Sequence, residues 1–97
     1  MLNKAQVWRQ ISAGLKPGMF ISTWSERDGS GPEFKIEEVS NSAILIAPES
    51  SGKARRLVQA SFDEIVDYRN AGSARTELKT RNSSYALGIL KHLGIIQ

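Results

Sequence analysis

The sequence predicts an α+β fold made of an N-terminal helix, a small antiparallel sheet of three or four strands and two C-terminal helices packed on the sheet. Apolar residues recur at helical spacing near both ends of the chain, and they alternate with polar residues in the middle. Short runs rich in Gly, Pro, Ser and Asn separate these segments. Because the connections between successive strands are short, we expect the strands to form a meander.

The first helix is expected to begin after Asn3 and to end near Gly14. An asparagine side chain accepts hydrogen bonds from the amides of a first helical turn, which makes Asn3 a suitable N-cap. The Lys-Pro-Gly run at 16–18 then breaks the chain. Between these signals lies an apolar stripe at helical spacing, formed by Val7, Trp8, Ile11 and Leu15.

Residues 19–25 form the first expected strand, and they place large apolar side chains on both faces. Met19 and Ile21 lie on one face, and Phe20 and Trp24 lie on the other. We therefore expect this strand to be central or covered on both sides. Its aromatic residues, together with Trp8, are expected in the core rather than on a surface that stacks bases.

Two or three further strands are expected after a polar loop at 26–32. Phe34 and Ile36 alternate with charged residues, which is the pattern of a strand with one solvated face. Val39 has the wrong parity for the buried face, so we expect a bulge or the strand end near Glu38. The remaining candidates are a short buried strand at 43–47 and a short fourth strand at 56–58.

A helix is expected to follow the strands. Ser61 and Glu64 have the S-x-x-E spacing of a capping box, and Gly72 is placed to end the helix. A winged-helix fold is the alternative, because two helices joined by a turn also suit a helix-turn-helix. Its usual turn of about 3–4 residues is shorter than the connection from 72 to 82, although a short helix at 75–80 would weaken this objection.

The last helix is expected to begin after Asn82 as its N-cap and to end at Gly94. Gly88 in mid-helix costs about 1 kcal/mol relative to alanine, so we expect another backbone to approach it closely. The apolar face of this helix consists of Ala86, Leu87, Ile89, Leu90 and Leu93.

Composition limits the class of protein. The chain of 97 residues is expected to form a single domain over 1–97. It contains no cysteine, which excludes disulfides, thiolate catalysis and cysteine-ligated zinc. No apolar run suits a signal peptide or a membrane span, so we expect a cytoplasmic protein with no membrane partner.

The sequence offers no pattern for catalysis. His92, the only histidine, is expected at a helix end without a motif partner. Glu37 and Glu38 are adjacent on a strand and point to opposite faces. The run 51–53 resembles the end of a phosphate-binding loop, but Ala47 stands where the first glycine is needed. We expect no catalytic residue, no metal and no cofactor, and we favour a non-enzymatic function.

Basic charge gathers in the C-terminal part of the chain. Residues 1–48 carry five basic and five acidic side chains, whereas from residue 69 onward five basic side chains face Glu77 alone. These five are Arg69, Arg75, Lys79, Arg81 and Lys91. A local excess of positive charge attracts phosphates even when the net charge is only +3.

A binding module for nucleic acid or another anionic partner is therefore the first functional hypothesis. The N-terminus of the last helix suits an anion, because its amides and its dipole favour negative charge. The candidate phosphate contacts are Arg75, Lys79, Arg81 and Lys91, and the candidate direct readers are Asn82, Ser83, Ser84 and Tyr85. The alternative interpretation is a solvated basic face, a helix cap and a tyrosine at the edge of the core.

A homo-oligomer, most simply a dimer, is the second hypothesis. The first strand is apolar on both faces, and Ile95 and Ile96 follow the last helix without obvious cover. Small domains often bury such surface against a second copy.

The C-terminal third of the chain also resembles a known group of sequences. The shared pattern comprises Phe62, Ile65, Tyr68, Gly72, Arg75, Glu77, Leu78, Asn82, Ser84, Tyr85, Ile89 and Leu90. It resembles small uncharacterised bacterial proteins carried on mobile elements, including integron gene cassettes, and segments of some restriction-associated proteins. The resemblance implies a small α+β module of unknown activity and carries over no catalytic residue.

Overall fold

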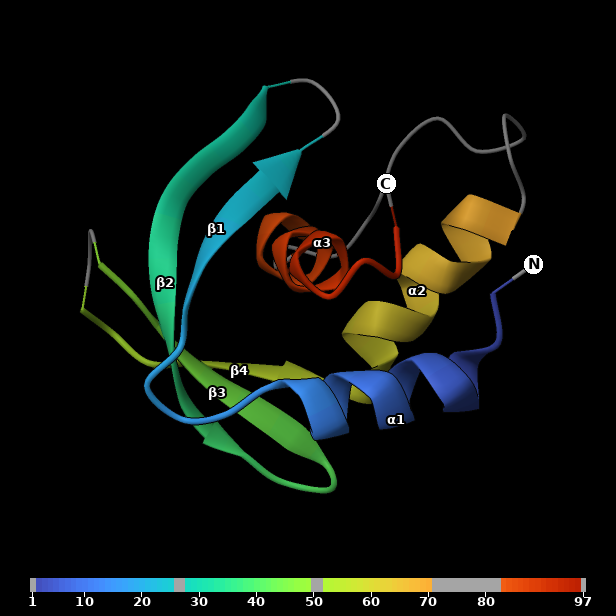
Figure 1. Ribbon diagram of the computed structural model, residues 1–97, viewed down its shortest axis with the longest axis horizontal. Coiled ribbons are helices and arrows are strands. Elements are labelled where there is room, and N and C mark those ends of the chain that lie inside the picture. Colours follow the sequence, from blue (N-terminus) through green and yellow to red (C-terminus); the bar gives the residue numbers. More distant parts are fainter. Residues whose placement is uncertain (1, 26–27, 50–51, 71–82, 97) are drawn as a thin grey trace.

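The computed structural model describes residues 2–25, 28–49, 52–70 and 83–96, and it confirms the predicted α+β fold. A curled sheet lies on one side of the molecule and three helices pack against its inner face (Figure 1). In chain order the elements are α1 (Lys4–Gly14), β1 (Phe20–Ser25), β2 (Gly29–Val39), β3 (Ala43–Pro48), β4 (Arg55–Val58), α2 (Gln59–Asn70) and α3 (Ser83–His92). Of the helices described, none has the length and apolar character needed to cross a membrane.

The four strands form the predicted meander. Their order in the sheet is β1-β2-β3-β4, and each strand pairs antiparallel with the next. The fourth strand, expected as a short addition, pairs with β3 over four residues. Because the order in space follows the order in the chain, β1 and β4 are the two edges of the sheet.

The first helix begins and ends where the sequence predicts. The Asn3 side chain accepts a hydrogen bond from the Gln6 amide at 3.0 Å, which confirms Asn3 as the N-cap. Val7 and Ile11 are buried, and Trp8 packs against the core at a tilted angle to Phe62, with 5.7 Å between ring centroids. The helix face with 3.6-residue spacing therefore covers the core as expected.

The prediction that the first strand is central or covered on both sides is wrong. β1 is an edge strand, and its Phe20 side chain is 51% exposed. Ile21, on the other face, is buried. The helices cover only the inner face of the sheet, so apolar side chains on both faces of β1 cannot both be buried.

The polar loop expected at 26–32 is also shorter than predicted. β2 begins at Gly29, which has a positive φ of 72° and pairs with Ser25. Within this pairing Thr23 stands opposite two residues, Gly31 and Pro32, which form a bulge. The Thr23 hydroxyl donates to the Pro32 carbonyl oxygen at 2.9 Å. A bulge accommodates a proline because it does not require every amide to join the ladder.

A second bulge lies in β2 where Val39 predicts it. Ile36 pairs with Ile46 and Glu38 with Leu45, which leaves Glu37 as the extra residue. The extra residue reverses the alternation of faces and turns Val39 toward the core, against which it packs. The expectation of an irregularity near Glu38 is confirmed.

The capping box predicted at Ser61 is wrong, although the buried face of the helix is as expected. α2 begins at Gln59, directly after the last residue of β4, so Ser61 already lies inside its first turn. The chain passes from strand to helix with no linker for a separate cap. Phe62, Ile65 and Val66 are buried. Gly72, expected to end this helix, lies outside the described residues.

The last helix begins at Ser83, immediately after the predicted cap Asn82, which itself lies outside the described residues. Its end follows the Schellman pattern. The Ile95 amide donates to the Leu90 carbonyl at 2.9 Å, the Gly94 amide donates to the Lys91 carbonyl at 3.1 Å, and Gly94 has a φ of 74°. The chain then folds back and buries Ile96, with Ile95 packed against the core. The expectation that these two isoleucines lack cover is wrong.

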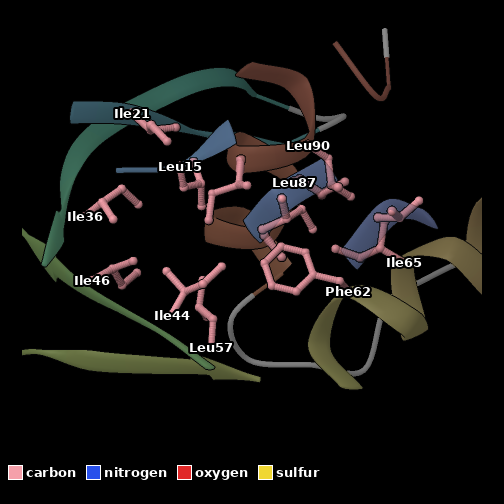
Figure 2. Packing of buried hydrophobic residues seen from close by; sticks show 14 of the residues in the cluster. Leu15, Ile21, Ile36, Ile44, Ile46, Leu57, Phe62, Ile65, Leu87 and Leu90 are labelled. Carbon is pink, nitrogen blue, oxygen red and sulfur yellow. The ribbon is translucent and has the colours of Figure 1, made fainter. Parts of the chain in front are cut away.

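The core lies between the sheet and the helices (Figure 2). Side chains from the strands line one side of it, and side chains from the helices close the other. Its largest fully buried members are Phe34, Phe62, Ile11, Ile21, Ile36, Ile44, Ile46, Leu57, Ile65, Ile89, Leu90 and Val66. Every described helix and strand contributes to this single cluster.

Gly88 sets the distance between α3 and the sheet, as predicted from its place in mid-helix. A Cβ atom at this position would collide with the Ser22 carbonyl oxygen and lie 3.1 Å from the Thr23 Cα. Both are backbone atoms of β1, which cannot move as the end of a side chain can. Only glycine permits this contact.

We expect Gly88→Ala to lower the free energy of unfolding by about 1–3 kcal/mol, because overpacking against backbone outweighs the better helix propensity of alanine. Gly14→Ala is the matched control. Its Cβ would meet only the Leu93 side chain, with Cδ2 at 2.7 Å, and that side chain can rotate away. Urea denaturation of both variants checks this. A Gly88→Ala protein as stable as the Gly14→Ala protein would contradict the role given to the contact.

Candidate functional site

The structure describes four of the eight predicted site residues. Ser83, Ser84 and Tyr85 form the first turn of α3, and Lys91 lies in its last turn. Six residues separate Tyr85 from Lys91, which corresponds to about 9 Å along a helix axis. The first three therefore lie together, and Lys91 lies apart from them. Outside the described residues are Arg75, Lys79, Arg81 and Asn82.

Tyr85 is held between two side chains of the sheet. Its ring makes an edge-to-face contact with Phe34 of β2, with centroids 5.3 Å apart and an interplanar angle of 83°. The Arg55 guanidinium of β4 lies over the same ring, 5.6 Å from its centroid. Tyr85 is half-buried. The packing on Phe34 matches the interpretation of a tyrosine at the edge of the core, and the contact with Arg55 adds a positive charge to that edge.

Arg55 is the site residue that the sequence analysis missed. It belongs to an exposed run, Lys53-Ala54-Arg55-Arg56, that leads into and begins β4. This run lies between residues 1–48, where basic and acidic side chains balance, and the basic part of the chain from residue 69 onward. A cluster of three basic residues within four positions is the signal that was available.

The arginines of β4 face different sides of the sheet. Arg55 pairs with Ile46, whose side chain points into the core, and it reaches Tyr85 on the same inner side. Arg56 pairs with Leu45 on the opposite, outer face. Both arginines are exposed. Of these two arginines, Arg55 is therefore the one that adjoins the first turn of α3.

The first turn of α3 and Arg55 together form a positively charged surface patch. The first amides of a helix have no carbonyl partner within the helix, and the helix dipole places partial positive charge there. The hydroxyls of Ser83 and Ser84 stand in this turn, and both residues are half-buried. The Arg55 guanidinium brings a full positive charge to the ring of the next residue. This combination is suited to holding an anion.

Lys91 makes a different contact. Its ammonium lies over the ring of Trp24 in β1, 4.7 Å from the ring centroid. The neighbouring His92 is exposed at the end of the helix. Across the residues that the structure describes, no three His, Asp or Glu side chains gather to hold a metal ion. The described side chains named here at α3 offer hydrogen bonding and positive charge.

The chain was compared with protein-family models, curated proteins and solved structures, and none of the three comparisons found a match. The resemblance to mobile-element proteins therefore stays a prediction.

Substitutions of Tyr85 separate the contribution of its ring to stability from that of its hydroxyl. We expect Tyr85→Phe to change the free energy of unfolding by less than about 0.5 kcal/mol, because the contacts with Phe34 and Arg55 are made by the ring. Tyr85→Ala removes the ring and should cost about 2 kcal/mol. Thermal or urea unfolding measures both. A loss of stability in Tyr85→Phe as large as that in Tyr85→Ala would show that the hydroxyl, rather than the ring, carries the stabilisation.

Proposed function

We propose that this chain is a small, non-enzymatic binding module that holds the phosphate backbone of nucleic acid through a basic surface beside the N-terminus of α3. The surface comprises Arg55, Ser83, Ser84 and Tyr85. Arg75, Lys79, Arg81 and Asn82 stay candidates on sequence grounds and lie outside the described residues. Lys91 contributes a separate contact. The same surface chemistry would also serve another polyanionic partner.

The position of Arg55 over the Tyr85 ring is the observation that carries this proposal. It brings a positive charge from β4 to the N-terminus of α3, which the sequence alone had already indicated as a place for an anion. An arginine held on an aromatic ring is partly oriented before binding, so less side-chain entropy is lost on contact with a phosphate. The hydroxyls and amides of the first turn supply further donors to phosphate oxygens.

The cellular setting is proposed on sequence grounds. The lack of cysteine is compatible with a reducing cytoplasm. The resemblance of residues 62–90 to cassette-borne bacterial proteins supports an origin on a mobile element.

Adjacent arginines on β4 give a direct test. Fluorescence anisotropy with labelled duplex and single-stranded DNA and RNA, at low salt, compares Arg55→Gln with Arg56→Gln. Each variant loses the same charge from an exposed position on the same strand. We expect Arg55→Gln to weaken binding about five- to tenfold and to reduce the slope of log K against log salt by about 1, whereas Arg56→Gln has a smaller effect.

Equal effects of the two substitutions would contradict a site beside α3 and indicate general attraction to a basic domain. The absence of binding at micromolar protein would remove the nucleic-acid proposal. Competition by polyglutamate as strong as that by unlabelled nucleic acid would point to another anionic partner instead.

Self-association through β1 is a second candidate function, supported by one observation. β1 is an edge strand, and Phe20 is the one large hydrophobic side chain that stands exposed among the described residues. An edge strand with an exposed aromatic residue can pair with a second copy of the same strand. This candidate no longer draws support from Ile95 and Ile96, which pack against the core.

Light scattering over a dilution series tests this second candidate. We expect a dimer at high protein concentration that Phe20→Ser converts to a monomer. Because Phe20 is exposed, the free energy of unfolding of the variant should stay within about 0.5 kcal/mol of the wild-type value, measured at a dilution where the wild type is also monomeric. A wild-type protein that stays monomeric at the highest concentration would exclude it.

A further inference from the structure

A small depression lies between β1 and α3, near the end of α3 that is remote from Tyr85. Its volume is about 170 Å³. Polar residues of three elements line it: Ser22 of β1, Ser30 of β2, and Lys91 and His92 of α3. The ring of Trp24 forms an apolar wall.

The close contact at Gly88 creates this depression. Because Gly88 has no side chain, the backbone of α3 lies directly against the backbone of β1 at Ser22 and Thr23. Lys91, almost one helical turn further along, then reaches the Trp24 ring. The cation–π contact orients the ammonium at the depression, so the positive charge there is placed by the fold.

The lining restricts the ligand to a small oxyanion. Pockets for drug-sized ligands are about 300–1,000 Å³, so this one accepts only a small group. Every charged or polar side chain in the lining can donate a hydrogen bond, and no carboxylate is among the described residues that line it. Lys91 covers a face of the Trp24 ring, so that face is not open for a base to stack on.

The C-terminal end of a helix normally disfavours an anion, because its free carbonyls carry partial negative charge. Here three of these carbonyls are occupied. The Ile89 carbonyl accepts from Leu93 at 3.0 Å, and the carbonyls of Leu90 and Lys91 accept from Ile95 and Gly94. The Schellman end of α3 thus reduces the repulsion that an anion beside Lys91 would meet.

We propose that this depression binds a single phosphate group, either as the free ion or as a phosphate monoester such as the terminal phosphate of a nucleotide. Lys91 supplies the charge, Ser30 donates a hydrogen bond from β2, and His92 donates from the rim. The site goes beyond the proposed function: of the residues named there it uses only Lys91, which lies apart from the surface at Arg55, and it would bind phosphate even if the chain bound no nucleic acid.

Two-dimensional amide NMR of the full chain tests the site at constant ionic strength. Inorganic phosphate, uridine 5′-monophosphate and uridine are titrated separately. We expect saturable shifts confined to the amides of Ser22, Ser30, Gly88 and His92 and to the Trp24 indole, with both phosphates but not with uridine. Tighter binding of the monophosphate than of phosphate would identify a monoester as the ligand, and equal binding would identify the free ion.

Variants assign the binding to Lys91. We expect Lys91→Gln to weaken phosphate binding about tenfold or more, Ser30→Ala to weaken it less, and Lys91→Arg to keep most of it. Lys16→Gln, which removes an exposed lysine from the turn between α1 and β1, is the control and should have no effect. The dispersion of the amide spectrum verifies that each variant is folded.

Three results would overturn the assignment: linear shifts that do not saturate, equal losses in Lys91→Gln and Lys16→Gln, or binding of uridine as tight as that of its monophosphate. Loss of nucleic-acid binding in Arg55→Gln with intact phosphate shifts would support this site while leaving the surface at Arg55 separate. The two proposals can therefore fail independently.

Discussion

The contact between Gly88 and the backbone of β1 is the constraint on which the rest of the structure depends. It fixes how deeply α3 sits on the sheet, and α3 touches strands at both of its ends. A helix held further away would lift Tyr85 off Phe34 and carry it beyond reach of Arg55, whose distance of 5.6 Å is close to the limit of about 6 Å for such contacts. Both surfaces considered for binding are thus consequences of one missing side chain.

Local signals predicted the elements well, because each depends on residues that are neighbours in the chain. Asn3 caps α1 with its own side chain, Val39 reveals the bulge through its parity, and Gly94 ends α3 with a positive φ. The predictions that were wrong concerned which face of the sheet is covered and where one element passes into the next. Alternation shows which side chains of β1 are apolar, but it does not show that helices cover only one face, so the exposure of Phe20 could not be derived. The capping box predicted at Ser61 was wrong because β4 continues directly into α2.

The candidate site was predictable in part for the same reason. Ser83, Ser84 and Tyr85 follow from the start of a helix, which is a local feature. Arg55 belongs to the candidate site because it contacts Tyr85, and these two residues lie far apart in the sequence. Periodicity carries no information on such a contact, because it depends on how the sheet curls beneath the helix. The basic run at 53–56 indicates a local positive charge, but it does not indicate which helix that charge lies against.

The two bulges of β2 make the length of this strand partly independent of which of its side chains face the core. Each places one residue more in β2 than the partner strand requires, at Gly31-Pro32 and at Glu37. Removing Glu37 would leave Ile36 and Val39 on their present faces, because the surplus residue, not the alternation, would be lost. The deletion would straighten the strand and flatten the sheet around the helices, since bulges increase local twist. Chain length in β2 therefore controls the curvature of the fold separately from the identity of its core.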